Sequence, residues 1–302
     1  MAAATKALKD KLPVLGLAPT TQAGGLKVEA LTEADKGEAL NFLAARPVHT
    51  VCMSGFIRDN GVVSPKNRGT FYGCRNHSGE LKGVALIGHA TLFETQNDEA
   101  LQAFACLKNQ IQTAHLVRGE HDTISKFMHH YRQFGHEPRL ACREILFVRT
   151  STVEEEVVPQ LRNATLNELE ALKQLNAEFI KAECGIDPLK RDPVGFASRL
   201  ASRIEKKRVW VWEHEGEIIF KADVFAQTPQ VAYLEGVFVN PEYRNRGIGV
   251  RCMRDLSQRL LKNSESLCLL INEQREQLEN FYIKAGYERR GVYDTLYLSP
   301  EN

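Results

Sequence analysis

Residues 243–249, YRNRGIG, combine two arginines and two glycines in one short stretch. The stretch follows an apolar run, LEGVFVNPE, and precedes VRCMRDLSQRLL, whose apolar residues recur at helical spacing. A helix that begins at a glycine-rich turn presents unpaired backbone N–H groups and the positive end of its dipole, and both suit a phosphate. Gly247 and Gly249 would let the backbone approach a ligand, while the arginines would add positive charge. The YRNRGIG turn therefore predicts a pyrophosphate-binding site.

Two other phosphate loops do not fit this turn. A P-loop requires Gly-Lys-Ser or Gly-Lys-Thr, whereas the chain reads Gly249-Val250-Arg251. A dinucleotide-binding fingerprint requires a third glycine, and Cys252 stands at that position. A basic surface turn that only begins a helix is the remaining alternative.

Metal-ligating patterns are missing from the sequence. The seven cysteines contain no C-x-x-C pair, and their odd number argues against a disulfide framework. His129 and His130 are adjacent, so on a helix their side chains point in different directions. We expect free thiols and assign no metal.

The elements around the turn are predicted from periodicity. Residues 165–183 begin with a capping box, Thr165 to Glu168, and Asp192 with Pro193 begins a second helix. The apolar and aromatic runs RVWVWEH, EIIFKADVFA and VAYLEGVFVN then predict three antiparallel strands. After the turn come a helix, the strand LCLLIN, the helix QREQLENFYIKAG and the strand VYDTLYLS. This order predicts an α+β fold with a mixed, mostly antiparallel sheet flanked by helices.

With these elements in place, residues 160–298 resemble the GNAT superfamily of N-acetyltransferases. The superfamily signature R/Q-x-x-G-x-G/A is present as residues 244–249, between a strand and a helix. A second family feature, Y-x-x-x-G-[FY], is present at Tyr282, Gly286 and Tyr287. The order of the two motifs, each after its own strand, makes the resemblance specific.

The resemblance implies that the ligand is acetyl-CoA or another acyl-CoA, used as a co-substrate. The pantetheine arm would lie along the backbone of one strand like an added strand. The residues implied in cofactor binding are Val237, Phe238, Val239, Arg244, Asn245, Arg246, Gly247, Ile248, Gly249 and Asn272.

Acyl transfer to an amine requires a base, oxyanion donors and a proton for the leaving thiolate. By the resemblance, Tyr282 is the general acid, Glu235 is the base, and the N–H group of Val237 is an oxyanion donor. Taken alone, the residues also allow Tyr282 to be a core side chain and Glu235 to be a solvated carboxylate. Where the family often has an asparagine seven residues before the tyrosine, this chain has Arg275.

The first half contains weak repeats of the second. NHSGEL at 76–81 parallels EHEGEI at 213–218, and YRQFGH at 131–136 parallels YIKAGY at 282–287. Where the phosphate turn should recur, residues 89–102 read HATLFETQNDEALQ, which is acidic and lacks glycine. Such a loop would repel a pyrophosphate. We expect tandem GNAT-like domains, with residues 1–24 a flexible N-terminus, 25–150 a divergent domain that binds no coenzyme A, and 151–302 the catalytic domain.

Length and charge agree with such a chain. A length of 302 residues favours two domains. The 39 basic and 38 acidic residues give no overall attraction to nucleic acid or membranes. The N-terminal stretch has no apolar run long enough for a signal peptide or membrane span. We expect a cytoplasmic protein, monomeric or homodimeric.

The function we expect is transfer of the acetyl group of acetyl-CoA to a primary amine, by direct attack within a ternary complex. The acceptor would be a small-molecule amine or a peptide N-terminus. The first half would complete or cover the acceptor site, because clefts between domains often bind ligands. Two alternatives stay open: a longer acyl group, as in tandem-domain glycine N-acyltransferase-like enzymes, and a non-catalytic acyl-CoA sensor.

Overall fold

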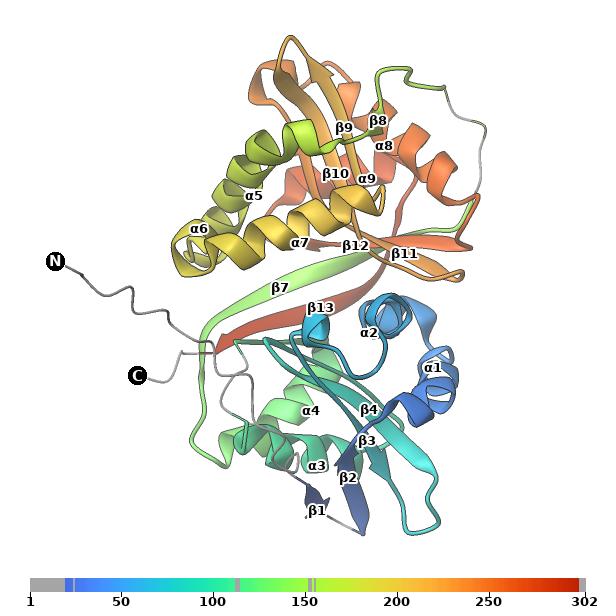
Figure 1. Cartoon of the computed structure of the whole chain (residues 1–302), viewed down its shortest axis with the longest axis vertical. Coiled ribbons are helices and arrows are strands. Elements are labelled where there is room, and N and C mark those ends of the chain that lie inside the picture. The colour runs from blue at the N-terminus through green and yellow to red at the C-terminus, as the bar shows by residue number, and fades with distance from the viewer. Residues whose placement is uncertain (1–19, 24, 112–114, 152–153, 155, 299–302) are drawn as a thin grey trace, which may run out of the picture.

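The computed structural model describes residues 20–23, 25–111, 115–151, 154 and 156–298. Two lobes lie one above the other, and two long strands cross between them (Figure 1). Of the N-terminal segment expected to be flexible, residues 21–23 form a short strand, and residues 1–19 and 24 lie outside the described part.

The first half of the chain supplies the lower lobe of Figure 1 and one of the crossing strands. Its elements are β1 (Thr21–Ala23), β2 (Leu26–Ala30), η1 (Glu33–Asp35), α1 (Lys36–Leu43), α2 (Pro47–Asn60), η2 (Pro65–Asn67), β3 (Gly69–Arg75), β4 (Leu81–Gly88), β5 (Ala90–Thr95), α3 (Asp98–Asn109), β6 (Leu116–Glu120), α4 (His121–Arg132) and β7 (Pro138–Arg149).

The second half forms the upper lobe and the other crossing strand. Its elements are β8 (Arg162–Asn163), η3 (Leu166–Glu168), α5 (Leu169–Cys184), α6 (Pro188–Arg191), α7 (Pro193–Glu205), β9 (Val209–His214), β10 (Glu217–Gln227), β11 (Val231–Val239), η4 (Pro241–Tyr243), α8 (Ile248–Leu260), β12 (Ser266–Asn272), α9 (Glu276–Lys284) and β13 (Glu288–Leu298).

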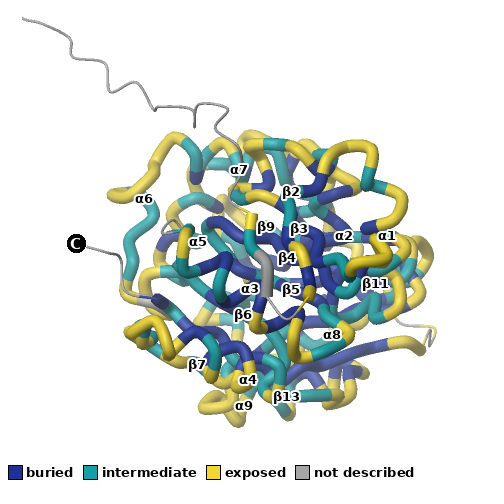
Figure 2. Tube along the Cα trace, turned by 90° about the horizontal axis from the view of Figure 1, so that it is seen from below, coloured by how far each residue is buried: buried dark blue, intermediate teal, exposed yellow. Residues whose placement is uncertain are grey.

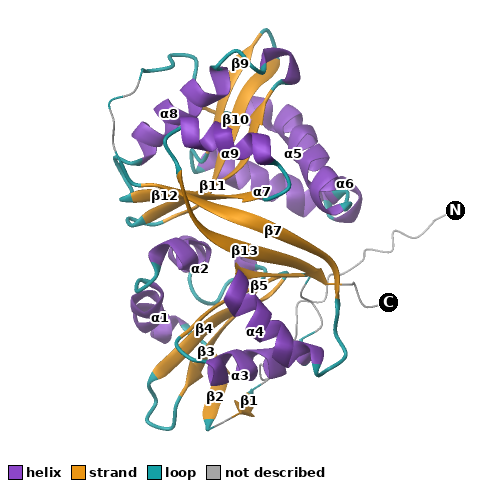
Figure 3. Ribbon diagram, turned by 180° about the vertical axis from the view of Figure 1, so that it is seen from behind, coloured by secondary structure: helices purple, strands orange, loops and turns teal. Residues whose placement is uncertain are grey.

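All these strands belong to one sheet, in the order β1-β2-β3-β4-β5-β6-β13-β7-β12-β11-β10-β9-β8. The pairs β5–β6 and β11–β12 are parallel, and the other neighbouring pairs are antiparallel. Helices cover both faces of the sheet (Figure 3). The mixed, mostly antiparallel sheet flanked by helices is therefore confirmed.

The two halves exchange their last strands. Strand β7 ends the first half but pairs with β12 of the second half, and β13 ends the second half but pairs with β6 of the first. Strands β7 and β13 also pair with each other from Leu298/Pro138 to Glu288/Val148. The sheet therefore runs without a break through the middle of the molecule, where Figure 1 shows both strands crossing.

Local sequence signals explain where the helices of the second half begin. Thr165 and Glu168 form the predicted capping box, in which Glu168 accepts a hydrogen bond from the Thr165 N–H at 2.6 Å. Asp192 caps α7 by accepting from the Gly195 N–H at 2.9 Å, and Pro193 occupies the first helical position. These caps place α5 and α7 over the sheet of the second half.

Each lobe has its own hydrophobic core, and Figure 2 shows buried backbone through the middle of the molecule. In the first half, Phe104 and Phe127 from α3 and α4 are fully buried. In the second half, α8 buries Met253 and Leu256 against β11 and β12. A third cluster joins the lobes, because Val51 of α2 packs with residues of β7, β11, β12 and β13.

Candidate active site

Strands β11 and β12 run side by side only over their first residues. Their parallel pairs extend from Val231/Ser266 to Leu234/Leu269 and then stop. Beyond that point, residues 235–239 continue to pair with β10 on the other edge. This part of β11 therefore has one edge with no strand partner in the described chain, and such an edge can bond an extended ligand.

A β-bulge lies at the start of this free edge. Glu235 pairs with Asp223 and Phe238 with Lys221, so β11 has one more residue than β10 between those pairs. Gly236 adopts φ 59°, a left-handed conformation that glycine accepts without strain. The Lys221 ammonium donates to the Gly236 carbonyl at 3.1 Å and is fully buried. Because of the bulge, Glu235 and Val237 lie on opposite faces of the sheet.

Helix α8 begins at the YRNRGIG turn. Gly247 is its N-cap with φ 76°, and no side chain caps the helix. The first backbone N–H groups of α8, from Ile248 to Val250, therefore keep no intrahelical or capping partner. A Cβ at Gly247 would meet no atom within 4 Å, whereas one at Gly249 would lie 2.8 Å from Val239 and 2.9 Å from Phe281. Gly249 thus lets α8 begin tightly against β11 and α9.

The basic side chains of the turn have different partners. Arg244 donates from Nε to the Val239 carbonyl at 3.0 Å, which ties the turn to the end of β11. Arg246 lies over the Tyr243 ring, 5.5 Å from its centroid. Asn245 adopts φ 59°, and Arg251 forms an exposed ion pair with Glu156 at 3.1 Å.

Tyr282 is buried on the α8 and α9 face of the sheet, in the same cluster as Leu234. Its ring contacts Phe147, Phe281 and Tyr287. Its hydroxyl makes no hydrogen bond within the described part of the chain. Burial raises its pKa well above the ordinary tyrosine value, so the hydroxyl keeps its proton.

Glu235 lies on the other face of β11, within a cluster of charged side chains. Its Oε1 accepts from Arg203 Nη1 at 2.9 Å, and the same nitrogen donates to Asp223 at 3.0 Å. Lys221 forms an ion pair with Asp223 at 3.0 Å. Burial raises the pKa of Glu235 above its ordinary value, and Arg203 only partly opposes this effect. The side chain is still 33% exposed, so a proton-bearing ligand can reach it.

Sequence reasoning missed Arg203, Lys221 and Asp223. A signal was available for the last two, because charged side chains two residues apart share one face of an otherwise apolar strand. Arg203 belongs to a helix and meets Glu235 only in the folded chain. Asn272 ends β12, where its side-chain oxygen accepts from the Gln274 N–H at 2.9 Å within its own turn.

The first half has the corresponding strand–helix junction without these features. Strand β5 pairs with β4 without a register shift, so it has no bulge. Helix α3 is capped by Asn97, which accepts from the Ala100 N–H at 3.0 Å, and Asp98 and Glu99 lie in its first turn. The cap and the two carboxylates both oppose anion binding at this helix.

Charged residues of the first half lie near Glu235. Arg118 of β6 lowers the pKa of Glu235 slightly, against the larger effect of burial. Glu183 of α5 also has a raised pKa, through partial desolvation of its carboxyl group although the residue as a whole is exposed, with Glu144 of β7 and Glu235 adding to the effect. The exchanged strand β7 therefore brings the first half to the face of the sheet on which Glu235 lies.

Two features are missing from the described part of the chain. It holds no group of three or more His, Cys, Asp or Glu side chains arranged to bind a metal ion. None of its helices combines the length and apolar composition needed to cross a bilayer.

Comparison with known proteins agrees with this geometry. The sequence model of the acetyltransferase (GNAT) domain matches residues 205–289, from the end of α7 into β13. No curated protein matches the chain. Among solved structures, a Drosophila protein from a structural genomics programme is 12% identical, with a TM-score of 0.66 over 91% of this chain and 99% of that one.

Two further solved structures have the same fold. A tandem GNAT protein from the clavulanic acid biosynthesis pathway is 12% identical, with a TM-score of 0.56 over 92% of this chain and 100% of that one. A GNAT-family acetyltransferase from Colwellia psychrerythraea is 13% identical, with a TM-score of 0.53 over 90% and 99%. Identities this low establish the fold alone. The family match assigns residues 205–289 to the GNAT acetyltransferase domain, and the solved structures show that the chain as a whole has the fold of a tandem GNAT protein, with a further GNAT-like region in its first half.

Proposed function

We propose that the chain transfers the acetyl group of acetyl-CoA to a primary amine within a ternary complex. The observation that carries this proposal is the free edge of β11 beside a helix whose first turn has no capping side chain. A strand edge suits the amide groups of pantetheine, and a helix N-terminus suits a pyrophosphate. The two features adjoin, as a coenzyme A molecule requires.

In this proposal, the N–H groups of residues 248–250 hold the pyrophosphate. The open space at Gly247 leaves room for it, and the arginines of the turn add positive charge. The backbone of residues 237–239 holds the pantetheine arm. Asn272 would contribute at the end of β12, although its side-chain oxygen already accepts a hydrogen bond from its own turn.

The proton transfers are assigned to residues on opposite faces of β11. Glu235 removes a proton from the acceptor amine, and its raised pKa brings it closer to neutral pH, where a general base is most effective. The N–H group of Val237, at the bulge, donates to the oxyanion that forms on the thioester carbonyl. Tyr282 then gives its proton to the departing thiolate.

The acceptor would enter from the face that carries Glu235. Arg118 and Glu144 of the first half act on the charges there, so the first half would help to form the acceptor site. Acidic side chains on this face suit an acceptor that arrives as an ammonium ion, which is the form of a small amine or a peptide N-terminus.

Release of free thiol from acetyl-CoA in the presence of a mixture of primary amines tests the proposal. We expect thiol release that depends on the amines and disappears when they are omitted. If coenzyme A binds but no amine or peptide N-terminus supports thiol release, the chain is a sensor and the proposed function is wrong.

A further inference from the structure

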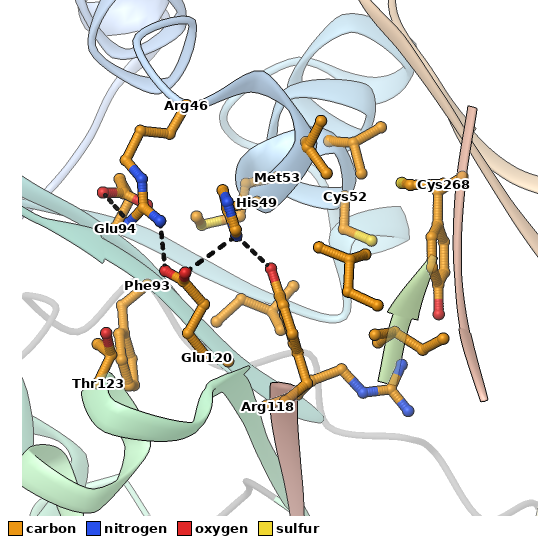
Figure 4. Close-up of a pocket in the computed structure, with 18 of the residues that line it drawn as sticks. Arg46, His49, Cys52, Met53, Phe93, Glu94, Arg118, Glu120, Thr123 and Cys268 are labelled. Carbon is orange, nitrogen blue, oxygen red and sulfur yellow. Dashed lines mark hydrogen bonds and ion pairs between the residues drawn. The ribbon is translucent and has the colours of Figure 1, made fainter. Parts of the chain in front are cut away.

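The first half has a cavity at the point where its own parallel strands separate. Strands β5 and β6 pair at Ala90/Leu116 and Thr91/Val117 and then diverge, as β11 and β12 do in the second half. The cavity has a volume of about 70 Å³ and lies between β5, β6, the start of α2 and the central strands (Figure 4). It occupies the place in the first half that the acyl site would occupy in the second.

A group of polar side chains lines one end of the cavity. Arg46 donates to Glu120 at 2.5 Å through Nη2, and through Nη1 it contacts both Glu94 oxygens at 3.3 and 3.5 Å. His49 Nδ1 lies 2.7 Å from the Tyr293 hydroxyl and 3.5 Å from Glu120. Figure 4 shows Arg46, Glu94, His49 and Glu120 gathered at this end.

The charges at this end do not balance. Burial lowers the pKa of His49, so its imidazole is neutral and Arg46 is the local cation. Two carboxylates, Glu94 and Glu120, face this single guanidinium. Arg118 also lines the cavity, but its guanidinium points away from the group in Figure 4 and pairs with Thr295 and Glu144. When both carboxylates are ionised, one negative charge is therefore left without a compensating cation.

Glu94 is the less satisfied of the two carboxylates. Glu94 is only 9% exposed. Both of its carboxylate oxygens contact the same Arg46 nitrogen, at distances that are long for charged hydrogen bonds. Burial raises its pKa, as expected for a carboxylate with too little compensation. A ligand that donates hydrogen bonds and carries positive charge would supply the missing partner and stabilise the ionised form of Glu94.

The rest of the cavity limits the size and polarity of such a ligand. Its other walls include Val48, Val51, Leu146 and Leu270, which are apolar, together with the Cys52 thiol. Burial raises the pKa of Cys52 to about 12, so the thiol is neutral. Since one water needs about 10–15 Å³ by this measure, the cavity has room for roughly five non-hydrogen atoms. A short carbon chain fits these walls.

We propose that this cavity binds a small organic ammonium ion, with its ammonium group beside Arg46 at the end of the cavity that Glu94 and Glu120 line and its carbon chain against Val51 and Leu146. These acidic and apolar side chains come from α2, β5, β6 and β7, and β11, β12 and β13 of the second half complete the walls. Arg118 and Tyr233 bring the cavity next to the face of β11 that carries Glu235, but binding of an ammonium ion here does not require acyl transfer.

Isothermal titration of the full-length chain with ethylammonium chloride, without acyl-CoA, tests the proposal. Ethanol and acetate, which have similar size but neutral or negative charge, serve as comparison ligands. We expect saturable binding of ethylammonium and none of ethanol or acetate. Glu94→Gln, which is nearly isosteric, should weaken binding at least tenfold. Glu99→Gln removes an exposed carboxylate outside the cavity and should leave binding unchanged.

Glu120→Gln should weaken binding in the same way, and circular dichroism confirms that each variant is folded. Absence of ethylammonium binding to the wild-type chain would overturn the proposal. Wild-type affinity for ethylammonium in both Glu94→Gln and Glu120→Gln, or binding of ethanol as tight as that of ethylammonium, would also overturn it. The ethylammonium titration contains no acyl-CoA, and coenzyme A binding is measured separately. Ethylammonium binding can therefore be interpreted even if the proposed acyl transfer is not observed.

Discussion

The ion pair between Arg203 and Glu235 predicts the direction in which the pH profile of kcat/KM shifts when Arg203 is replaced. A general base acts only when deprotonated, so kcat/KM falls as the pH drops through the pKa of Glu235 in the free enzyme. That pKa lies above its ordinary value of 4.5 because of burial, and Arg203 is the main group that opposes the increase. Replacing Arg203 by Met should raise the pKa further and move the acidic limb to higher pH.

The size of this displacement follows from the geometry. A cation within about 4–6 Å typically lowers a carboxyl pKa by about 1–3 units. The pair lies at 2.9 Å but is partly exposed, so solvent screening favours the lower end of that range. We expect the acidic limb to move up by about one pH unit in Arg203→Met. Asp223 keeps Lys221 as its partner, so the fold should be retained.

Thiol release from acetyl-CoA, followed across the acidic pH range with the amine well below its KM, gives kcat/KM and so measures the limb. Arg203→Lys keeps the positive charge and should leave the limb close to its wild-type position. Glu235→Gln should lower kcat about 10²–10⁴-fold and abolish the limb. An acidic limb that stays at the same pH in Arg203→Met, or that survives in Glu235→Gln, would refute Glu235 as the base.

Three further predictions concern single residues. Tyr282→Phe should lower kcat by about 10²-fold or more in the same assay, and unchanged turnover at all pH values would exclude Tyr282 as the acid. Lys221→Met removes one of the partners of the buried Asp223 carboxylate. It should lower the free energy of unfolding, measured by urea titration, by about 3–5 kcal/mol. The double variant Lys221→Met, Asp223→Leu should recover part of that loss. Leu256→Ala, at a fully buried site, should cost about 2–5 kcal/mol, while Leu166→Ala, at a side chain that is 51% exposed, should change stability by no more than about 0.5 kcal/mol. Equal stability of the Leu256 and Leu166 variants would show that α8 does not depend on this core.

The elements of the second half could be predicted because their signals are local. The capping box at Thr165, the cap at Asp192 and the change to strand periodicity after residue 208 are all confirmed. The beginning of α8 at Ile248 follows from the glycines of the turn. The repeated strand turns at 76–81 and 213–218 also lie where predicted, between β3 and β4 and between β9 and β10.

The exchange of β7 and β13 could not be read from the sequence. Alternation along PRLACREILFVR predicts a strand and its two faces, but a strand pattern does not name its neighbours. The same limit applies to Arg203, which lies 32 residues before Glu235 and meets it only after α7 packs on the sheet. Gly236 within LEGVFV did carry a signal for the bulge, because a glycine inside a strand often marks one.

The central claim is that this chain has one acyl-CoA site, formed by β11 and the start of α8. Calorimetric titration with coenzyme A tests it most directly, because it counts the bound molecules per chain. We predict one bound molecule per wild-type chain and none for folded Gly249→Glu. The control variant Gly37→Glu, which changes an exposed glycine with open space around it, should also bind one molecule. Two molecules per chain, or undiminished binding in Gly249→Glu, would contradict the account.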